Sequence, residues 1–211
     1  MAGNLVRAAA AAVGGRSLGR LVPQNTALFL CDMQEKFRPN IKHFAEVVQI
    51  SNRLLQAASV LDIPSIVTEQ YPKGLGHTVP ELEVEKYGLT PIAKTQFSMC
   101  VPEVDEMLKA NKNISSVILC GIETHACILQ TTMDLLERDY EVHVVADACA
   151  SRSHLDRVYA LERVRRLGGF VTTSECAILS LAPNSAHPKF RQLQKIIWTP
   201  APDSGLLPTP P

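Results

Sequence analysis

The sequence lacks three features, and each absence excludes or disfavours a class of protein. No apolar run approaches the ~20 residues that a membrane-spanning helix needs, which excludes a transmembrane protein. Neither sign of charge is in excess, because 21 Lys and Arg residues balance 21 Asp and Glu residues. Nucleic-acid binders usually carry a basic excess, so we expect no nucleic-acid partner. No CxxC pair is present, and the chain is too large for a disulfide-stapled scaffold.

What remains is the composition of a globular protein. A length of 211 residues suits one domain, and 46% apolar with 20% charged residues excludes disorder throughout. Several of the cysteines lie inside apolar runs, where a free thiol behaves as a small apolar side chain. We therefore predict an intracellular protein, cytoplasmic or mitochondrial and not secreted. The six cysteines are Cys31, Cys100, Cys120, Cys127, Cys149 and Cys176.

The two ends of the chain differ from the rest. Residues 1–23 contain three arginines, and no acidic residue occurs before Asp32. This composition resembles a mitochondrial transit peptide, although a disordered extension of a cytosolic protein would look the same. Residues 199–211 contain five prolines and are expected to be unstructured. The predicted domain is 24–198.

Apolar periodicity predicts strands that alternate with helices. The strands are short continuous apolar runs, and the helices show apolar residues at helical spacing. This alternation predicts an α/β fold with a mostly parallel sheet covered by helices on both faces, a three-layer Rossmann-like arrangement. Ligand sites in such sheets lie at the carboxyl ends of the strands. The expected strands are 27–31, 65–68, 91–93, 116–120, 142–146 and 170–172, and the expected helices are 43–61, 102–110, 125–138, 153–167, 175–181 and 188–197.

Three side chains with reactive groups follow expected strands. Asp32 and Lys94 each come directly after a strand, and Cys127 lies in the first turn of a helix that Thr124 is expected to cap. The backbone N–H groups of that turn and a nearby ammonium group favour a thiolate. Asp32 could then act as general base in acyl transfer through a thioester, with the backbone N–H groups of Glu123 and Cys127 as the oxyanion hole. By pattern alone, an inert buried thiol remains the alternative.

The segments around these residues resemble the three motifs of the isochorismatase-like cysteine hydrolases. The resemblance covers roughly residues 24–195 and implies the isochorismatase-like fold, an Asp–Lys–Cys triad at Asp32, Lys94 and Cys127, and a cis peptide between Ile122 and Glu123. It also implies a homo-oligomer and a substrate pocket, for which Gln34, Phe37, Phe97 and Thr124 are the candidates. Gln34 and Phe37 could equally anchor a loop. The motifs are LFLCDMQEKF at 28–37, AKTQFS at 93–98 and GIETHAC at 121–127.

The sequence departs from two branches of this superfamily. Nicotinamidases bind a metal through Asp and His residues after the second strand, but here that region reads TEQY at 68–71, with only His77 further on. We therefore expect no metal and no other cofactor. The isochorismatases of siderophore pathways generally lack the nucleophilic cysteine, which Cys127 supplies here. A small molecule with an amide-like C–N bond is thus the expected substrate.

Two other functions stay open. The chain could be a catalytically weak module that acts through a protein partner, since the loop after the second strand diverges and the tail is rich in proline. Redox sensing through Cys127 is disfavoured because no resolving cysteine lies nearby in the sequence. Cys31 is adjacent to Asp32, but strand alternation predicts that its side chain points to the opposite side.

Overall fold

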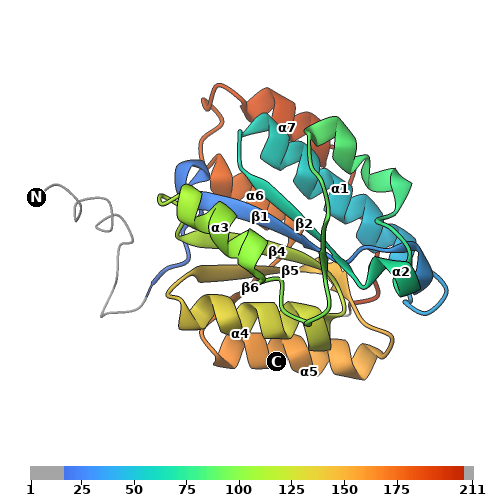
Figure 1. Cartoon of the computed structure of the whole chain (residues 1–211). Helices are drawn as coiled ribbons and strands as arrows, with labels where there is room; N and C mark the ends of the chain where they lie inside the picture. Colours follow the sequence, from blue (N-terminus) through green and yellow to red (C-terminus); the bar gives the residue numbers. More distant parts are fainter. Residues whose placement is uncertain (1–16, 207–211) are drawn as a thin grey trace, which may run out of the picture.

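The computed structural model describes residues 17–206 and contains one six-stranded sheet. Every pair of neighbouring strands is parallel, in the order β3-β2-β1-β4-β5-β6. The α/β prediction is confirmed (Figure 1). The strands are β1 (Thr26–Cys31), β2 (Ser65–Gln70), β3 (Ile92–Lys94), β4 (Ser116–Ile122), β5 (Glu141–Ala150) and β6 (Phe170–Thr172).

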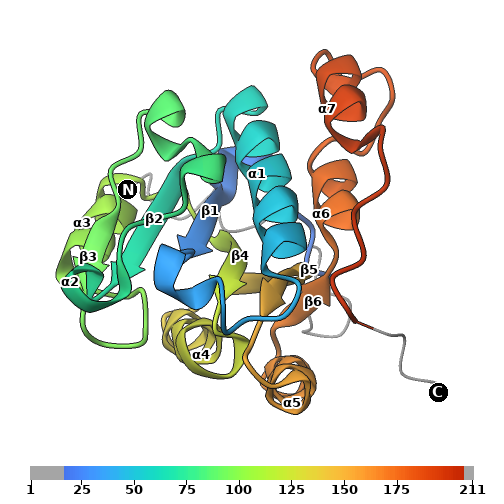
Figure 2. The same ribbon diagram turned by 90° about the vertical axis from the view of Figure 1, so that its right-hand side faces the viewer.

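Six longer helices cover the two faces of this sheet. One face carries α1 (Phe44–Val60), α6 (Ser174–Leu181) and α7 (Phe190–Ile197), and the other carries α3 (Pro102–Ala110), α4 (Leu129–Glu137) and α5 (His154–Arg166). Figure 2 shows the two groups on opposite sides of the sheet. A parallel sheet has this form because each crossover connection places a helix on one face.

Strand β1 shows how the sequence divides the core between the two faces. All six of its residues are buried. Leu28 and Leu30 pack with α1, whereas Ala27, Phe29 and Cys31 pack with α3 and α4 on the other face. Successive side chains of a strand point to opposite faces, so one continuous apolar run supplies both cores.

The segment 70–90, which we expected to be a loop, contains short helical turns. They are α2 (Pro72–Leu75) and the 3₁₀ helices Pro80–Leu82 and Val84–Tyr87. Two further 3₁₀ helices, Pro23–Asn25 and Glu35–Phe37, flank β1. Three expected strands run at least two residues past their predicted ends, since β2 continues to Gln70, β4 to Ile122 and β5 to Ala150.

The ends of the described chain pack onto the domain. Leu21 is buried, and Ser204 is buried with its carbonyl accepting a 2.6 Å hydrogen bond from Arg157 Nη1. Residues 199–206 form no helix or strand, and the Ser204 contact ties them to α5. Arginine-to-carbonyl hydrogen bonds anchor a segment that has no regular structure. The transit-peptide prediction for 1–16 and the rest of the tail prediction, 207–211, lie outside the described residues.

None of the helices among residues 17–206 has the length and apolar character needed to cross a membrane.

The order of the strands reverses beside β1. The chain runs outward from β1 to β2 and β3 on one side, and from β4 to β5 and β6 on the other. Ligand sites of parallel sheets are typically found at the carboxyl ends of the two strands that flank such a reversal, here β1 and β4. The three candidate residues Asp32, Lys94 and Cys127 all lie at this edge of the sheet.

We expect His143 in β5 to make the fold sensitive to acid. Its ring is stacked on Phe170 at a centroid distance of 4.8 Å, its Nε2 atom is buried without a partner, and burial lowers the pKa of His143 to about 4. An unfolded histidine has a pKa of about 6.5. The neutral ring therefore contributes stability above pH ~6.5, and this contribution is lost as the pH falls toward 4.

Urea unfolding at pH 7 and pH 4.5 measures this effect. Between the two values, wild type should lose about 2 kcal/mol more unfolding free energy than His143→Leu, which has no ionisable ring. The comparison cancels the carboxylates that both proteins share. Equal losses in the two proteins would show that His143 is protonated in the folded state without cost.

Candidate active site

Asp32 is held at the carboxyl end of β1 by its backbone and by the neighbouring strand. Its φ of 51° lies in the left-handed region, which Asp tolerates better than most residues. The backbone N–H of Asp32 donates to Thr68 O at 3.1 Å, and Thr68 Oγ1 donates to Asp32 Oδ1 at 2.7 Å. The carboxylate is fully buried. These bonds fix one carboxylate oxygen and leave the other for a cation.

Lys94, at the end of β3, supplies that cation. Its Nζ atom lies 2.6 Å from Asp32 Oδ2, 2.7 Å from Gln70 Oε1 and 2.9 Å from the carbonyl oxygen of Phe97. Burial alone would lower the pKa of the Lys94 ammonium, but the negative charge of its acidic neighbours outweighs burial and raises it. Lys94 is therefore charged at neutral pH, paired with a carboxylate in a buried site.

Cys127 lies close to this pair, in the turn that follows β4. Its Sγ atom lies 3.8 Å from Lys94 Nζ and within 4.8 Å of a carboxylate oxygen of Asp32. The chain leaves β4 through a cis peptide between Ile122 and Glu123, as the resemblance implied, and enters a π-helical turn, Thr124–Ile128, before α4 begins. Sequence periodicity predicted ordinary helix from 125 onward, because a single wide turn does not change the apolar pattern.

The predicted triad thus comes together in the structure. The ammonium group contacts both the carboxylate and the sulfur, so positive charge lies where a thiolate would form. The sulfur, the carboxylate and the ammonium come from three different crossover units of the sheet. Side chains that lie far apart in sequence meet here because parallel strands bring all their carboxyl ends to one edge.

Thr124 does not cap the helix as we expected. The N-terminal flanking position is Glu123, and no side chain there accepts a capping hydrogen bond. Within residues 17–206, the buried Thr124 hydroxyl has no hydrogen-bond partner. The prediction of a cap was wrong because the first turn is π-helical. The wider turn changes the direction of its backbone N–H groups, so the Thr124 hydroxyl does not accept from them.

Gln34 uses its side-chain amide to hold the loop after β2. Its Nε2 atom donates to the carbonyls of Gln70 and Gly76, at 2.9 and 2.6 Å, and its Oε1 atom accepts from the Gln70 backbone N–H at 2.7 Å. Of the two roles left open for Gln34, these bonds favour loop anchoring. Gln70, the last residue of β2, contacts Lys94. Gln34 therefore acts on the site through Gln70.

The two candidate pocket aromatics lie in different surroundings. Phe37 is half-buried against the core on the α1 face of the sheet. Phe97 has 58% of its surface exposed, and only its backbone carbonyl reaches Lys94.

The carboxylate of Glu123 pairs with Arg152, with Oε1 accepting a hydrogen bond from Arg152 Nε at 3.0 Å. Any part that Glu123 plays in an oxyanion hole therefore belongs to its backbone.

Sequence reasoning missed Thr68 and Gln70, the polar partners of Asp32 and Lys94. Both lie in β2, next to β1 in the sheet, and Thr68 is in register with Cys31. The available signal was the polar run that ends this strand, TEQ at 68–70, after the apolar residues at 66 and 67. A buried strand that ends in polar side chains beside a predicted acid indicates hydrogen-bond partners.

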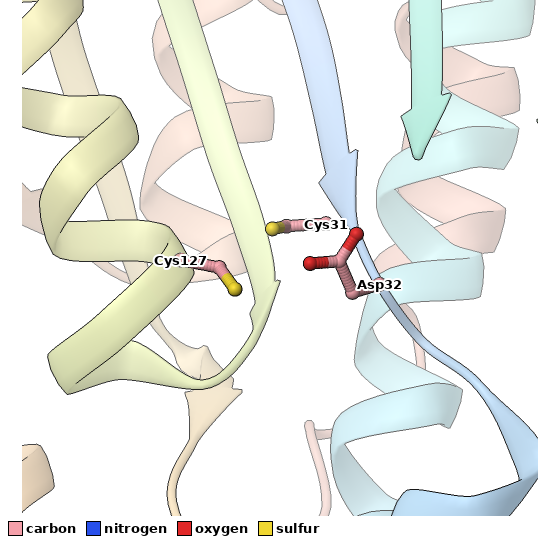
Figure 3. A group of neighbouring side chains, drawn as sticks. All are labelled: Cys31, Asp32 and Cys127. Atoms are coloured by element: carbon pink, nitrogen blue, oxygen red, sulfur yellow. The ribbon is translucent and has the colours of Figure 1, made fainter. Parts of the chain in front are cut away.

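The prediction for Cys31 was wrong. Figure 3 shows the Cys31 side chain directed toward Cys127, with the Asp32 carboxylate beside both. The two cysteine sulfurs and one carboxylate oxygen of Asp32 all lie within 4.8 Å of one another. Strict alternation fails at this point because the left-handed backbone of Asp32 ends the strand and redirects its side chain.

This group of three has the donor types of a soft-metal site, but Lys94 alters its chemistry. Thiolate sulfurs and a carboxylate suit zinc or similar ions. The Lys94 ammonium, 2.6 Å from the Asp32 carboxylate, already places a positive charge against this group. Two cations in one buried pocket would repel each other strongly. The arrangement suits activation of a thiol by an ammonium group better than metal binding.

Comparisons with known proteins agree with this geometry. The family model described as "Isochorismatase domain" matches residues 26–176. "Isochorismatase domain-containing protein 2" of Homo sapiens is 56% identical over 191 residues, which cover 90% of this chain and 92% of that protein. Its Xenopus laevis counterpart is 55% identical over 192 residues, which cover 91% and 93%.

Solved structures extend the comparison to three dimensions. A protein from Caenorhabditis elegans described as "MAR1 Ribonuclease" is 56% identical, with a TM-score of 0.84, and the match covers 91% of this chain and 99% of that one. The YcaC gene product of Escherichia coli, described as an octameric hydrolase of unknown specificity, has a TM-score of 0.74 over 84% of this chain and 90% of that one. At 22% identity the latter shows a shared fold.

Proposed function

The chain belongs to the isochorismatase family, and from that premise we propose that it is a cysteine hydrolase that cleaves the C–N bond of a small amide-like substrate. The observation that carries the proposal is the position of the Lys94 ammonium, 2.6 Å from Asp32 Oδ2 and 3.8 Å from Cys127 Sγ. A hydrolase that forms a thioester needs an ionised thiol and a base close to it. The family is one of hydrolases, and this geometry places a thiol, a carboxylate and an ammonium group side by side.

The first half of the reaction is acylation of Cys127. Asp32 takes the thiol proton, and Lys94 stabilises the resulting thiolate by its charge. The sulfur attacks the substrate carbonyl, and the backbone N–H groups of Glu123 and Cys127 would hold the oxygen that becomes negative. The proton on Asp32 then passes to the leaving nitrogen as the C–N bond breaks, which yields a free amine or ammonia and a thioester.

The second half is hydrolysis of that thioester. Asp32, again ionised, accepts a proton from water as the water oxygen attacks the thioester carbonyl. The C–S bond breaks, the acid product leaves, and the thiolate is restored beside Lys94. Lys94 remains an ammonium throughout, so its role is electrostatic, and its raised pKa suits that role.

Two other functions are distinguished by the same assay. A protein-interaction module would keep the fold and release no product. RNA cleavage would follow from the description of the C. elegans protein as a ribonuclease, although the balanced charge of this chain gives no basic excess for a phosphate backbone. Self-association, which is described for the octameric E. coli hydrolase, remains a prediction for this chain.

The test is a panel of short aliphatic and aromatic primary amides, with ammonia release and intact-protein mass as readouts. Wild type should release ammonia and carry a transient acyl group on Cys127. Cys127→Ala should lose at least ~10³-fold in turnover and carry no acyl group. Cys176→Ala is the matched control, because Cys176 is the exposed cysteine and should be dispensable.

Two results would contradict the hydrolase proposal. Turnover that survives in Cys127→Ala would remove Cys127 from the chemistry. If wild type neither releases ammonia nor acquires an acyl group from any member of the panel, while RNA is cleaved or a partner is bound, the amide-hydrolase proposal fails.

A further inference from the structure

We propose that Cys31 is a resolving cysteine, which forms a reversible disulfide with Cys127 when a hydroperoxide oxidises the site. This inference goes beyond hydrolysis, because it concerns what happens to the nucleophile when no substrate protects it. It rests on a second thiol at the end of β1, beside Asp32, that the proposed hydrolysis does not use. The disulfide would switch the nucleophile off and preserve it.

The geometry brings the two sulfurs within reach of each other. They lie within 4.8 Å, and in Figure 3 both side chains point into the space between β1 and the π-helical turn. A disulfide requires a separation of about 2.05 Å. Rotating a cysteine side chain from one staggered rotamer to another moves its sulfur by roughly 3 Å. A rotamer change directed at the partner sulfur is therefore large enough to cover the remaining distance.

The two thiols differ in the way that a reacting and a resolving cysteine must differ. Cys127 keeps 5% of its surface exposed, and its sulfur lies 3.8 Å from the Lys94 ammonium. Cys31 is completely buried. Burial raises the pKa of the Cys31 thiol well above its ordinary value, and the neighbouring Cys127 and Asp32 side chains raise it further. Cys31 thus stays protonated until Cys127 has been oxidised.

The reaction takes two steps. The Cys127 thiolate attacks one oxygen of the hydroperoxide, the O–O bond breaks, and an alcohol leaves with a proton from the site, so that Cys127 becomes a sulfenic acid. The Cys31 sulfur then attacks the Cys127 sulfur, the S–O bond breaks, and the departing hydroxyl takes the Cys31 proton as water. Two thiols and one hydroperoxide give one disulfide, one alcohol and one water. A dithiol reductant reverses the result by exchange.

Without a resolving partner, a sulfenic acid is oxidised further to sulfinic acid, which simple thiols do not reverse. The chain offers an internal comparison in Cys120 and Cys149. Both are buried thiols, directed to the carbonyls of Phe29 and Leu119, and burial raises the pKa of Cys149 to about 12. The hydrogen bonds of these two thiols run to backbone carbonyls and not to a lysine ammonium. They should stay reduced while Cys31 and Cys127 pair.

The experiment treats the full chain with a few equivalents of hydrogen peroxide, alkylates the remaining thiols, and identifies the products by peptide mass. Cleavage after Lys, Arg and Glu separates Cys120 from Cys127, because Glu123 lies between them. Wild type should lose two alkylatable thiols, yield a peptide joined through Cys31 and Cys127, and recover both thiols in dithiothreitol. In Cys31→Ser, Cys127 should pass to sulfinic acid and stay unrecovered, whereas Cys149→Ser should behave as wild type.

Two results would overturn the proposal. One is that wild type forms no peptide joined through Cys31 and Cys127. The other is that Cys127 is lost irreversibly to the same extent in wild type and in Cys31→Ser. The cross-link in wild type needs no variant to fold and no substrate to turn over. Failure of the hydrolase proposal therefore leaves this test intact.

Discussion

Replacing Lys94 with methionine should destabilise the fold by about 3–5 kcal/mol and abolish the selective reactivity of Cys127. The Lys94 ammonium and the Asp32 carboxylate form a 2.6 Å ion pair in which neither side chain is exposed. Methionine keeps the approximate volume but leaves the carboxylate charged, buried and without its cation. An unpaired buried charge is among the costliest defects that one substitution creates.

Urea unfolding and the rate of Cys127 alkylation by iodoacetamide measure the two effects. The control is the double variant Asp32→Asn/Lys94→Met, which removes both charges. The asparagine amide oxygen can still accept the hydrogen bond that Thr68 Oγ1 donates to Asp32. The double variant should be more stable than Lys94→Met alone, because removing both charges of a buried ion pair costs less than leaving one of them unpaired. Cys127 should react as slowly in the double variant as in Lys94→Met. A single variant as stable as wild type would show that the buried carboxylate does not depend on Lys94.

Replacing Gly121 with alanine should prevent folding or cost at least about 3 kcal/mol. Gly121 lies in β4, in register with Cys31, and has a φ of +123°. A Cβ atom built there would lie 2.1 Å from the carbonyl oxygen of Cys31, which is backbone and cannot turn aside. The alanine would push β4 away from β1 at the edge of the sheet where Asp32 and Cys127 meet.

Gly168→Ala separates this clash from backbone strain. Gly168 also has a positive φ, +94°, but a Cβ atom there meets nothing within 4 Å. It should cost only the ~1 kcal/mol typical of alanine at positive φ. Circular dichroism and thermal unfolding compare the two variants. Equal destabilisation by both would mean that β1 and β4 separate easily, and that the close approach at Gly121 is not required.

Much of the fold could be read from the sequence because apolar periodicity is local. The α3 helix begins and ends where predicted, at Pro102 and Ala110, since a proline at its first position and apolar residues at helical spacing mark it within a few residues of chain. The cap of α5 was likewise local, and Ser153 Oγ accepts from the Asp156 N–H. Strands β4 and β5 ran past their predicted ends, because pairing with neighbouring strands extends them beyond their apolar cores.

The candidate site divides in the same way. The sequence by itself determined that Asp32, Lys94 and Cys127 follow strands, and a parallel sheet gathers such residues at one edge. Only the tertiary structure decided that Lys94 contacts both of the others, that Thr68 and Gln70 hold the ion pair in place, and that Cys31 faces Cys127. The physical reason is the separation along the chain over which each kind of interaction acts. Propensity and periodicity act between residues a few positions apart, whereas a left-handed Asp32, a π-helical turn and the meeting of three crossover units depend on packing between segments separated by tens of residues.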